Sequence, residues 1–107
     1  MYKEQFIKAI QEKKMIRLTF FSKADGSSLI RKCAPMDFAP SRRAADKTPR
    51  YHFWDFESDT KNHTLSLLPN QIKFMENLNE TFDPAEFITW NTTTSPWSVP
   101  RDWGQYS

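Results

Sequence analysis

A run of alternating apolar and polar residues followed by a tight turn constrains this chain most. Residues 15–21 alternate with the period of two that is typical of a strand with one buried face. The Asp25-Gly26 pair comes next, and Asp-Gly favours a hairpin turn because glycine adopts positive φ at no steric cost. Residues 28–34 are then expected to return as the partner strand, with Pro35 ending it. The sequence therefore predicts a β-hairpin close to its N-terminus.

Other elements are expected on both sides of this hairpin. Residues 2–14 carry apolar side chains at helical spacing and predict a short helix that packs on another element. Residues 36–50 show no periodicity and predict a long exposed loop. Residues 51–57 and 63–68 are aromatic and apolar runs around a polar turn, which predicts a second hairpin. Residues 72–78 fit either a final strand or a helical turn, and both interpretations stay open.

The C-terminal part combines a helix start with an aromatic segment. Asp83 followed by Pro84 is a favourable helix N-terminus, and a brief helix is expected from there to about Trp90. We therefore divide the chain into a domain over residues 1–90 and a tail over residues 91–107. The tail contains three large rings, which predicts either that it docks back on the domain, the interpretation we prefer, or that it binds a partner: Trp97, Trp103 and Tyr106.

Length and composition favour one small folded domain. The chain has 107 residues, of which 38% are hydrophobic and 15% aromatic, and large rings bury much area per residue. The single cysteine, Cys33, excludes an intramolecular disulfide and is expected to be a buried small apolar residue. We expect a cytoplasmic protein that does not enter membranes, because the N-terminal residues resemble no signal peptide and no apolar run is long enough to span a bilayer.

The expected order of elements is helix, hairpin, loop, hairpin and final strand. This order predicts a mainly β fold with short helices, specifically a small SH3-like or Sm-like five-stranded barrel with an N-terminal helix. The same order carries a resemblance to the WYL domain family over roughly residues 6 to 84. The matching pieces are Ala9-Ile10, the apolar strand Ile16-Arg17-Leu18-Thr19-Phe20-Phe21, the Arg31-Lys32-Cys33-Ala34-Pro35 segment, Tyr51-His52-Phe53-Trp54-Asp55-Phe56-Glu57, Leu65-Ser66-Leu67 with Ile72, and Phe82-Asp83-Pro84.

The resemblance implies a ligand-sensing role. Domains of the WYL family often follow a DNA-binding helix-turn-helix in transcription regulators, and ligand binding is attributed to basic and polar groups on their strands. In this chain Ser66 stands where the family has a strand arginine, and Tyr51-His52-Phe53 stands in place of the tripeptide that names the family. The resemblance thus implies a stand-alone, divergent regulatory module.

Basic and aromatic residues that alternate along the chain predict where such a ligand would bind. Basic residues outnumber acidic ones between residues 17 and 50, whereas acidic residues dominate after residue 76. Arginines and rings together can bind phosphates and stack bases. The alternative is that the rings form the core and the arginines are ordinary surface residues. The candidate ligand-binding residues are Arg31, Arg50, His52, Trp54 and Ser66, with further phosphate contacts expected from Arg42, Arg43 and Lys47.

Two functions are therefore expected. The first is a non-enzymatic sensing module that binds a small anionic ligand or nucleic acid and acts in transcription or defence regulation. The alternative is a protein-interaction or assembly domain, a homodimer or a complex with another protein, which docks through Trp97, Trp103 and Tyr106.

We do not expect an enzyme, a metal site or a cofactor. The two histidines, His52 and His63, match no metal-ligand spacing, and Cys33 lacks an evident catalytic partner. The chain has only two glycines, so it has no glycine-rich phosphate loop.

Overall fold

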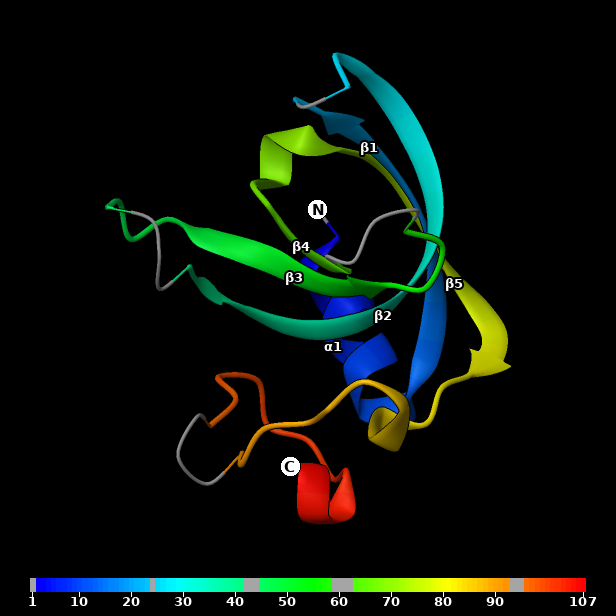
Figure 1. Ribbon diagram of the computed structural model, residues 1–107, viewed down its shortest axis with the longest axis vertical. Helices are drawn as coiled ribbons and strands as arrows, with labels where there is room; N and C mark the ends of the chain where they lie inside the picture. The colour runs from blue at the N-terminus through cyan, green and yellow to red at the C-terminus, as the bar shows by residue number, and fades with distance from the viewer. Residues whose placement is uncertain (1, 24, 42–44, 59–62, 93–95) are drawn as a thin grey trace.

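The protein consists of one antiparallel sheet with a helix at its N-terminal end (Figure 1). The computed structural model describes the chain except for residues 1, 24, 42–44, 59–62 and 93–95. In order along the chain the elements are α1 (Lys3–Glu12), β1 (Lys14–Ser22), β2 (Ser27–Pro40), β3 (Pro49–Asp55), β4 (Thr64–Leu67), the 3-10 turn η1 (Pro69–Gln71), β5 (Ile72–Thr81), and two further 3-10 turns, η2 (Pro84–Glu86) and η3 (Gly104–Tyr106).

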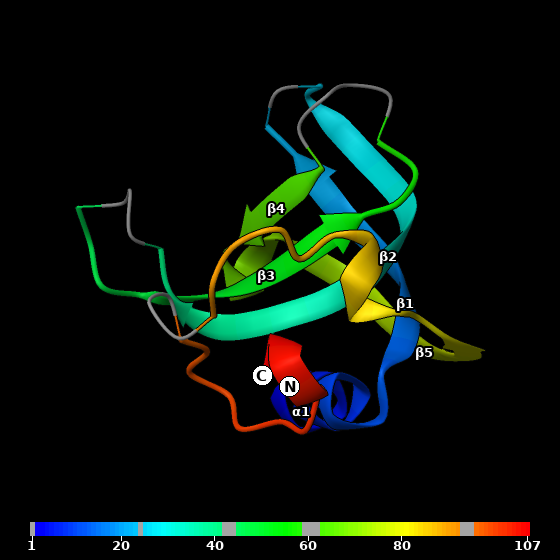
Figure 2. The ribbon, with the colours of Figure 1, turned by 60° about the horizontal axis from the view of Figure 1, so that its bottom comes forward.

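The strands are arranged in the order β4-β3-β2-β1-β5 and curve strongly (Figures 1 and 2). Within the described residues, β4 pairs only with β3 and β5 only with β1. The mainly β prediction with an N-terminal helix is therefore confirmed. The sheet is open, because the two outer strands do not pair with each other, so the closed five-stranded barrel that the element order predicts is not confirmed.

The N-terminal hairpin forms as predicted. β1 and β2 pair antiparallel, and Gly26 adopts a φ of 67° in the turn between them. Ile16, Leu18 and Phe20 are all buried, while the residues between them face the other side of the sheet. The period of two thus sets which face of β1 enters the core.

The predicted long loop over residues 36–50 is wrong in its extent. β2 continues through Pro35 to Pro40, and β3 already begins at Pro49. β2 pairs with β1 up to Cys33 and with β3 from Cys33 onward, and a bulge lies between Pro35 and Asp37. Because a bulge interrupts the hydrogen-bond ladder, a proline is tolerated there. The strand therefore changes partner at the point where the sequence signals an end.

Two C-terminal expectations are also decided by the structure. Residues 72–81 form the strand β5, so the helical interpretation is excluded. The helix expected from Asp83 to about Trp90 is only the turn η2, although the Asp83 carboxylate does accept a hydrogen bond from the Ala85 backbone N–H, as a cap should.

The core lies between the sheet, α1 and the tail over residues 91–107, which we call the C-terminal segment. α1 buries Phe6, whose ring packs edge-on against the rings of Tyr51 and Phe53 with centroids 4.9 and 5.2 Å apart. Trp103 from the C-terminal segment is 4% exposed, and its indole N–H donates to the carbonyl of Ile10 at the end of α1. Figure 2 shows this segment returning to lie beside α1. The segment after residue 90 thus contributes to the core.

None of the helices in the described part of the chain is long and apolar enough to cross a membrane.

Replacing Trp103 with alanine should therefore behave as a core truncation. We expect Trp103→Ala to lower the free energy of unfolding by about 3–5 kcal/mol. Trp90→Ala, in which the side chain removed is 37% exposed, should lower it by about 1 kcal/mol or less. Urea unfolding followed by circular dichroism measures both values. A loss for Trp103→Ala as small as the one expected for Trp90→Ala would show that the C-terminal segment is not part of the cooperative core.

Candidate functional site

A pocket of about 410 Å³ lies between the C-terminal segment and one face of β2 and β3. This volume is within the range of small-molecule sites, roughly 300–1,000 Å³. Its lining is mostly apolar or aromatic, with a few polar side chains: Met36, Asp37, Ala39, Pro40, His52, Thr64, Trp90, Pro96, Trp97 and Ser98. It is the best candidate for a ligand site among the described residues.

Strand alternation and the bulge in β2 together place the polar groups of this pocket. In β3, Tyr51 and Phe53 point into the core, so His52 between them points to the opposite face. After the bulge, Asp37 pairs with His52 across the two strands. One residue more or fewer in β2 would turn Asp37 to the core face.

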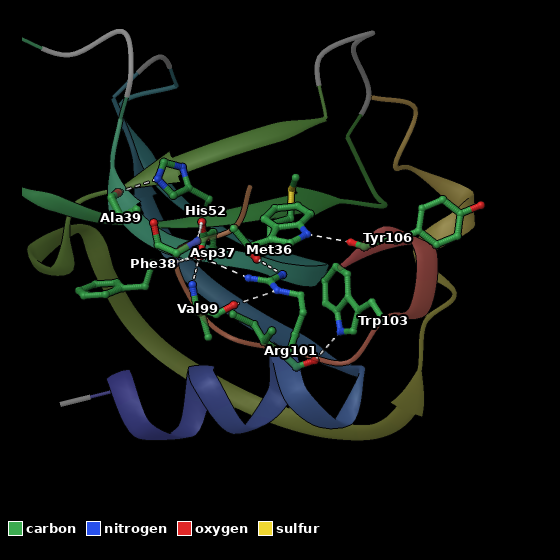
Figure 3. Close-up of polar contacts among 12 residues, drawn as sticks. Met36, Asp37, Phe38, Ala39, His52, Val99, Arg101, Trp103 and Tyr106 are labelled. Carbon is green, nitrogen blue, oxygen red and sulfur yellow. Dashed lines mark hydrogen bonds and ion pairs between the residues drawn. The ribbon is translucent and has the colours of Figure 1, made fainter. Parts of the chain in front are cut away.

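His52 is held by hydrogen bonds at both ring nitrogens. Its Nε2 lies 2.8 Å from the carbonyl oxygen of Ala39 (Figure 3), and its Nδ1 lies 2.8 Å from the hydroxyl oxygen of Ser66. A carbonyl only accepts, so Nε2 carries a hydrogen, and in the neutral ring Ser66 donates to Nδ1. The ring is thereby fixed in orientation as part of the pocket wall.

Asp37 joins the C-terminal segment to the sheet. Its carboxylate accepts hydrogen bonds from the backbone N–H groups of Ser98 and Val99, both at 2.9 Å, and forms an ion pair of 3.3 Å with Arg101 (Figure 3). These contacts join positions more than sixty residues apart in the chain. They hold the segment that forms the second wall of the pocket.

Arg101 is the second residue that holds the C-terminal segment against β2. Its side chain is 1% exposed and lies between two indole rings, 4.1 Å from the centroid of Trp97 and 4.4 Å from that of Trp103. The guanidinium also donates to the carbonyl oxygens of Met36 and Val99. Burial lowers the pKa of Arg101 to about 10, while the Asp37 charge opposes this shift, so the group stays charged at neutral pH.

The pocket has an unusual charge balance for the predicted anion site. Its lining includes the Asp37 carboxylate and contains no lysine or arginine. The donors around the carboxylate are already committed to it, and both nitrogens of His52 are engaged. What the lining offers a ligand is therefore the acidic side chain of Asp37, the hydroxyl-bearing Thr64 and Ser98, and the indoles of Trp90 and Trp97.

Four of the five predicted ligand residues share one face of the sheet. Arg50, His52 and Trp54 alternate along the same side of β3, and Ser66 pairs with His52 from β4. Only His52 lines the pocket itself. Trp54 instead stacks between His63 and Phe87, at centroid distances of 4.9 and 5.5 Å.

Arg31 lies on the opposite face from these residues. Its Nε is 3.4 Å from the buried carboxylate of Asp55, which points to the core side of β3. Arg31 therefore does not converge with Arg50 and His52, a question that the sequence leaves open, because the residues occupy different faces of the same sheet. Lys47 is exposed, whereas Arg42 and Arg43 lie outside the described residues.

The three rings of the tail, for which we prefer docking on the domain over binding a partner, are engaged within the chain. Trp103 is buried, Tyr106 packs against the core, and the Trp97 indole N–H donates to the carbonyl of Tyr106 at 2.8 Å (Figure 3). Trp90 was not among the residues selected from the sequence. Its ring is more exposed than these three, and its centroid lies 5.6 Å from that of Trp97.

Sequence reasoning also missed Asp37 and Arg101. Asp37 falls within the stretch interpreted as a loop, so its place opposite His52 depends on a strand that was not expected. Arg101 did carry a signal: it is the single basic residue after position 76, and it stands between two tryptophans.

The described residues offer little for nucleophilic or metal chemistry. Burial, followed by the negative charges of Asp55 and Glu57, raises the pKa of the Cys33 thiol far above neutral pH, which disfavours the reactive thiolate. In the part of the chain that the structure covers, no three His, Cys, Asp or Glu side chains gather closely enough to hold a metal ion.

Comparisons with protein-family models, with curated proteins and with solved structures find no significant match for this chain. The resemblance to the WYL domain family therefore stays a prediction.

The Asp37–Arg101 pair should show the energetics of a buried ion pair. Arg101→Met leaves the Asp37 charge without its partner and should lower the free energy of unfolding by about 3–5 kcal/mol. The double variant Asp37→Asn with Arg101→Met should lose less than the sum of the two single variants, because no unpaired charge remains. Additive losses, measured by urea unfolding, would contradict the coupling.

Asp55 should make stability depend on pH. Burial raises the pKa of Asp55 above its usual value, with the neighbouring N–H of Glu57 and the Arg31 charge opposing the shift. The folded state therefore holds this proton more tightly, and the stability it contributes below about pH 4 is lost as the pH rises through the raised pKa. Relative to Asp55→Asn, the wild-type protein should lose unfolding free energy as the pH increases from 3 to 7. The opposite trend would mean that the ion pair with Arg31 dominates.

Proposed function

We propose that the protein is a non-enzymatic binding module whose pocket takes a small organic ligand with an apolar or aromatic body and a cationic or N–H-bearing end. The observation that carries this proposal is the lining of the pocket: tryptophan and proline walls, one carboxylate, and no lysine or arginine.

The walls suit a flat or methylated group. Trp90 and Trp97 stand at an interplanar angle of 63° and present two differently oriented indoles to one space. Cations are attracted to the negative face of an indole, by about 0.5–2 kcal/mol. Trp97 already has Arg101 over its ring, so the ligand contact would fall mainly to Trp90, which is 37% exposed.

The polar groups suit a ligand that donates hydrogen bonds. Asp37 lines the pocket, and an anion placed there would find no lysine or arginine among the lining residues. Arg101, which pairs with Asp37, is buried and already donates to the carbonyl oxygens of Met36 and Val99. An ammonium or N–H group would meet an acceptor. The pocket therefore supports a different ligand charge from the one that the sequence suggested.

A regulatory role for the ligand-binding module is part of the same proposal. A regulatory module that senses a ligand for a partner, in transcription or defence, rests on the resemblance to the WYL family. The finer fold description, a small barrel of SH3-like or Sm-like type, belongs to the same proposal and is supported by the curved five-stranded sheet with its N-terminal helix.

A second candidate function is binding of an anionic ligand or nucleic acid near Arg50. The Arg50 Nε is buried and has no hydrogen-bond partner among the described residues, although a terminal nitrogen lies 3.5 Å from the Asp46 carboxylate. A phosphate oxygen could satisfy this donor, and the exposed Lys47 lies three residues away.

Two probes of similar size and opposite charge test the proposal. Benzyltrimethylammonium and benzoate are titrated separately, and the indole N–H signals are followed by NMR. The cation should shift the signals of Trp90 and Trp97, whereas benzoate should not. Trp90→Ala should weaken cation binding by roughly 2- to 30-fold. Phe74→Ala, which removes an exposed ring on β5 outside the pocket lining, is the matched control.

Other outcomes would overturn the proposal. Binding of benzoate in preference to the cation would show that the proposed ligand charge is wrong. Cation binding unaffected by Trp90→Ala would show that the pocket is not the site. Binding of a single-stranded oligonucleotide that weakens steeply with salt and is lost in Arg50→Ala would favour the second candidate.

A further inference from the structure

Three large apolar side chains are exposed together on the sheet, away from the pocket. Ile30 is 61% exposed, Phe74 54% and Phe21 38%. Thr19 in β1 pairs with Ile30 on one side and with Phe74 on the other, so these three residues form a row across β2, β1 and β5. Phe21 lies two residues further along β1 and therefore on the same side. We call this surface the Ile30 face.

The Ile30 face is the reverse of the core face. The residues that alternate with it in β1 are Ile16, Leu18 and Phe20, and all three are buried against the inside of the sheet. α1 packs on that inner side, so it leaves the Ile30 face uncovered (Figure 1). Groups of exposed apolar side chains on soluble proteins commonly mark interaction surfaces.

The charges around this face have balanced signs. Arg17 forms an exposed ion pair of 3.1 Å with Glu76, and Lys32 forms one of 3.0 Å with Glu80. Arg17 lies beside Thr19 on the same side of β1 and pairs across the strands with both Lys32 and Glu76. These two basic and two acidic groups therefore lie together at one end of the apolar row.

This balance of positive and negative charges limits the classes of partner that the Ile30 face can bind. Nucleic acid or an anionic membrane would require an excess of basic groups, which this border does not have. A second copy turned by a two-fold axis parallel to β1 would lie with its β5 over β2, and would so bring Glu76 of one copy opposite Lys32 of the other. An isologous interface needs such self-complementarity.

We propose that the Ile30 face binds a second copy of this chain and forms a two-fold symmetric dimer. The apolar row of one copy packs on the row of the other, and the ion pairs exchange partners or form a network around it. This inference is independent of the pocket, which lies on β2, β3 and the C-terminal segment.

Sedimentation velocity over a wide range of protein concentrations tests the proposal. The wild-type protein should pass from monomer to dimer as its concentration increases. Ile30→Glu should raise the dissociation constant by roughly tenfold or more, because each dimer would bury two uncompensated charges. Ile30→Thr, which keeps a β-branched residue in the strand, should weaken the dimer without disturbing the fold. Trp90→Ala, at the pocket, should leave it unchanged.

Mixing two charge variants identifies the partner as a second copy in the stated orientation. Lys32→Glu and Glu76→Lys should each associate more weakly than the wild type, and an equimolar mixture should recover association. A wild-type protein that stays monomeric at every concentration would overturn the proposal. A dimer insensitive to Ile30→Glu and Ile30→Thr would equally overturn it, by placing the interface elsewhere.

Discussion

The buried ion pair between Arg101 and Asp37 is the contact on which the C-terminal segment and the pocket depend. A charge that is 1% exposed is tolerated only where its donors are satisfied, and here a carboxylate, two carbonyl oxygens and two indole faces surround it. The pair anchors a segment that has little secondary structure of its own. With that segment in place, Trp103 closes the core beside α1 and Trp97 becomes a wall of the pocket.

The sheet then separates three environments by the alternation of its side chains. The inner face carries the core, and the face of β2 and β3 that bears His52 forms the floor of the pocket. The same reverse side, further along β1, β2 and β5, is the Ile30 face. β2 connects these regions because it pairs with β1 in its first part and with β3 in its second. The bulge near Pro35 adjusts the register between them, so a local irregularity decides which groups the pocket contains.

Patterns within short segments predicted their own structure well. The alternation in β1, the Asp25-Gly26 turn and the cap at Asp83 all depend on residues that are neighbours in sequence, and each forms as expected. The prediction of candidate site residues was less successful. His52 and Ser66 do meet, because they lie on paired strands, whereas Arg31 was grouped with them from its charge and lies on the other face beside Asp55.

The sequence by itself determined a mainly β chain with an N-terminal helix and an aromatic C-terminal segment, because periodicity and turn chemistry act over a few residues. Only the tertiary structure decided that β2 passes through Pro35, that the sheet stays open, and that Arg101 meets Asp37 across more than sixty residues. Such contacts depend on register and on which faces meet, and these emerge when distant segments bury their apolar surfaces together. The charge of the candidate pocket follows from those contacts, so the composition of the chain suggested a basic site where the fold places a carboxylate.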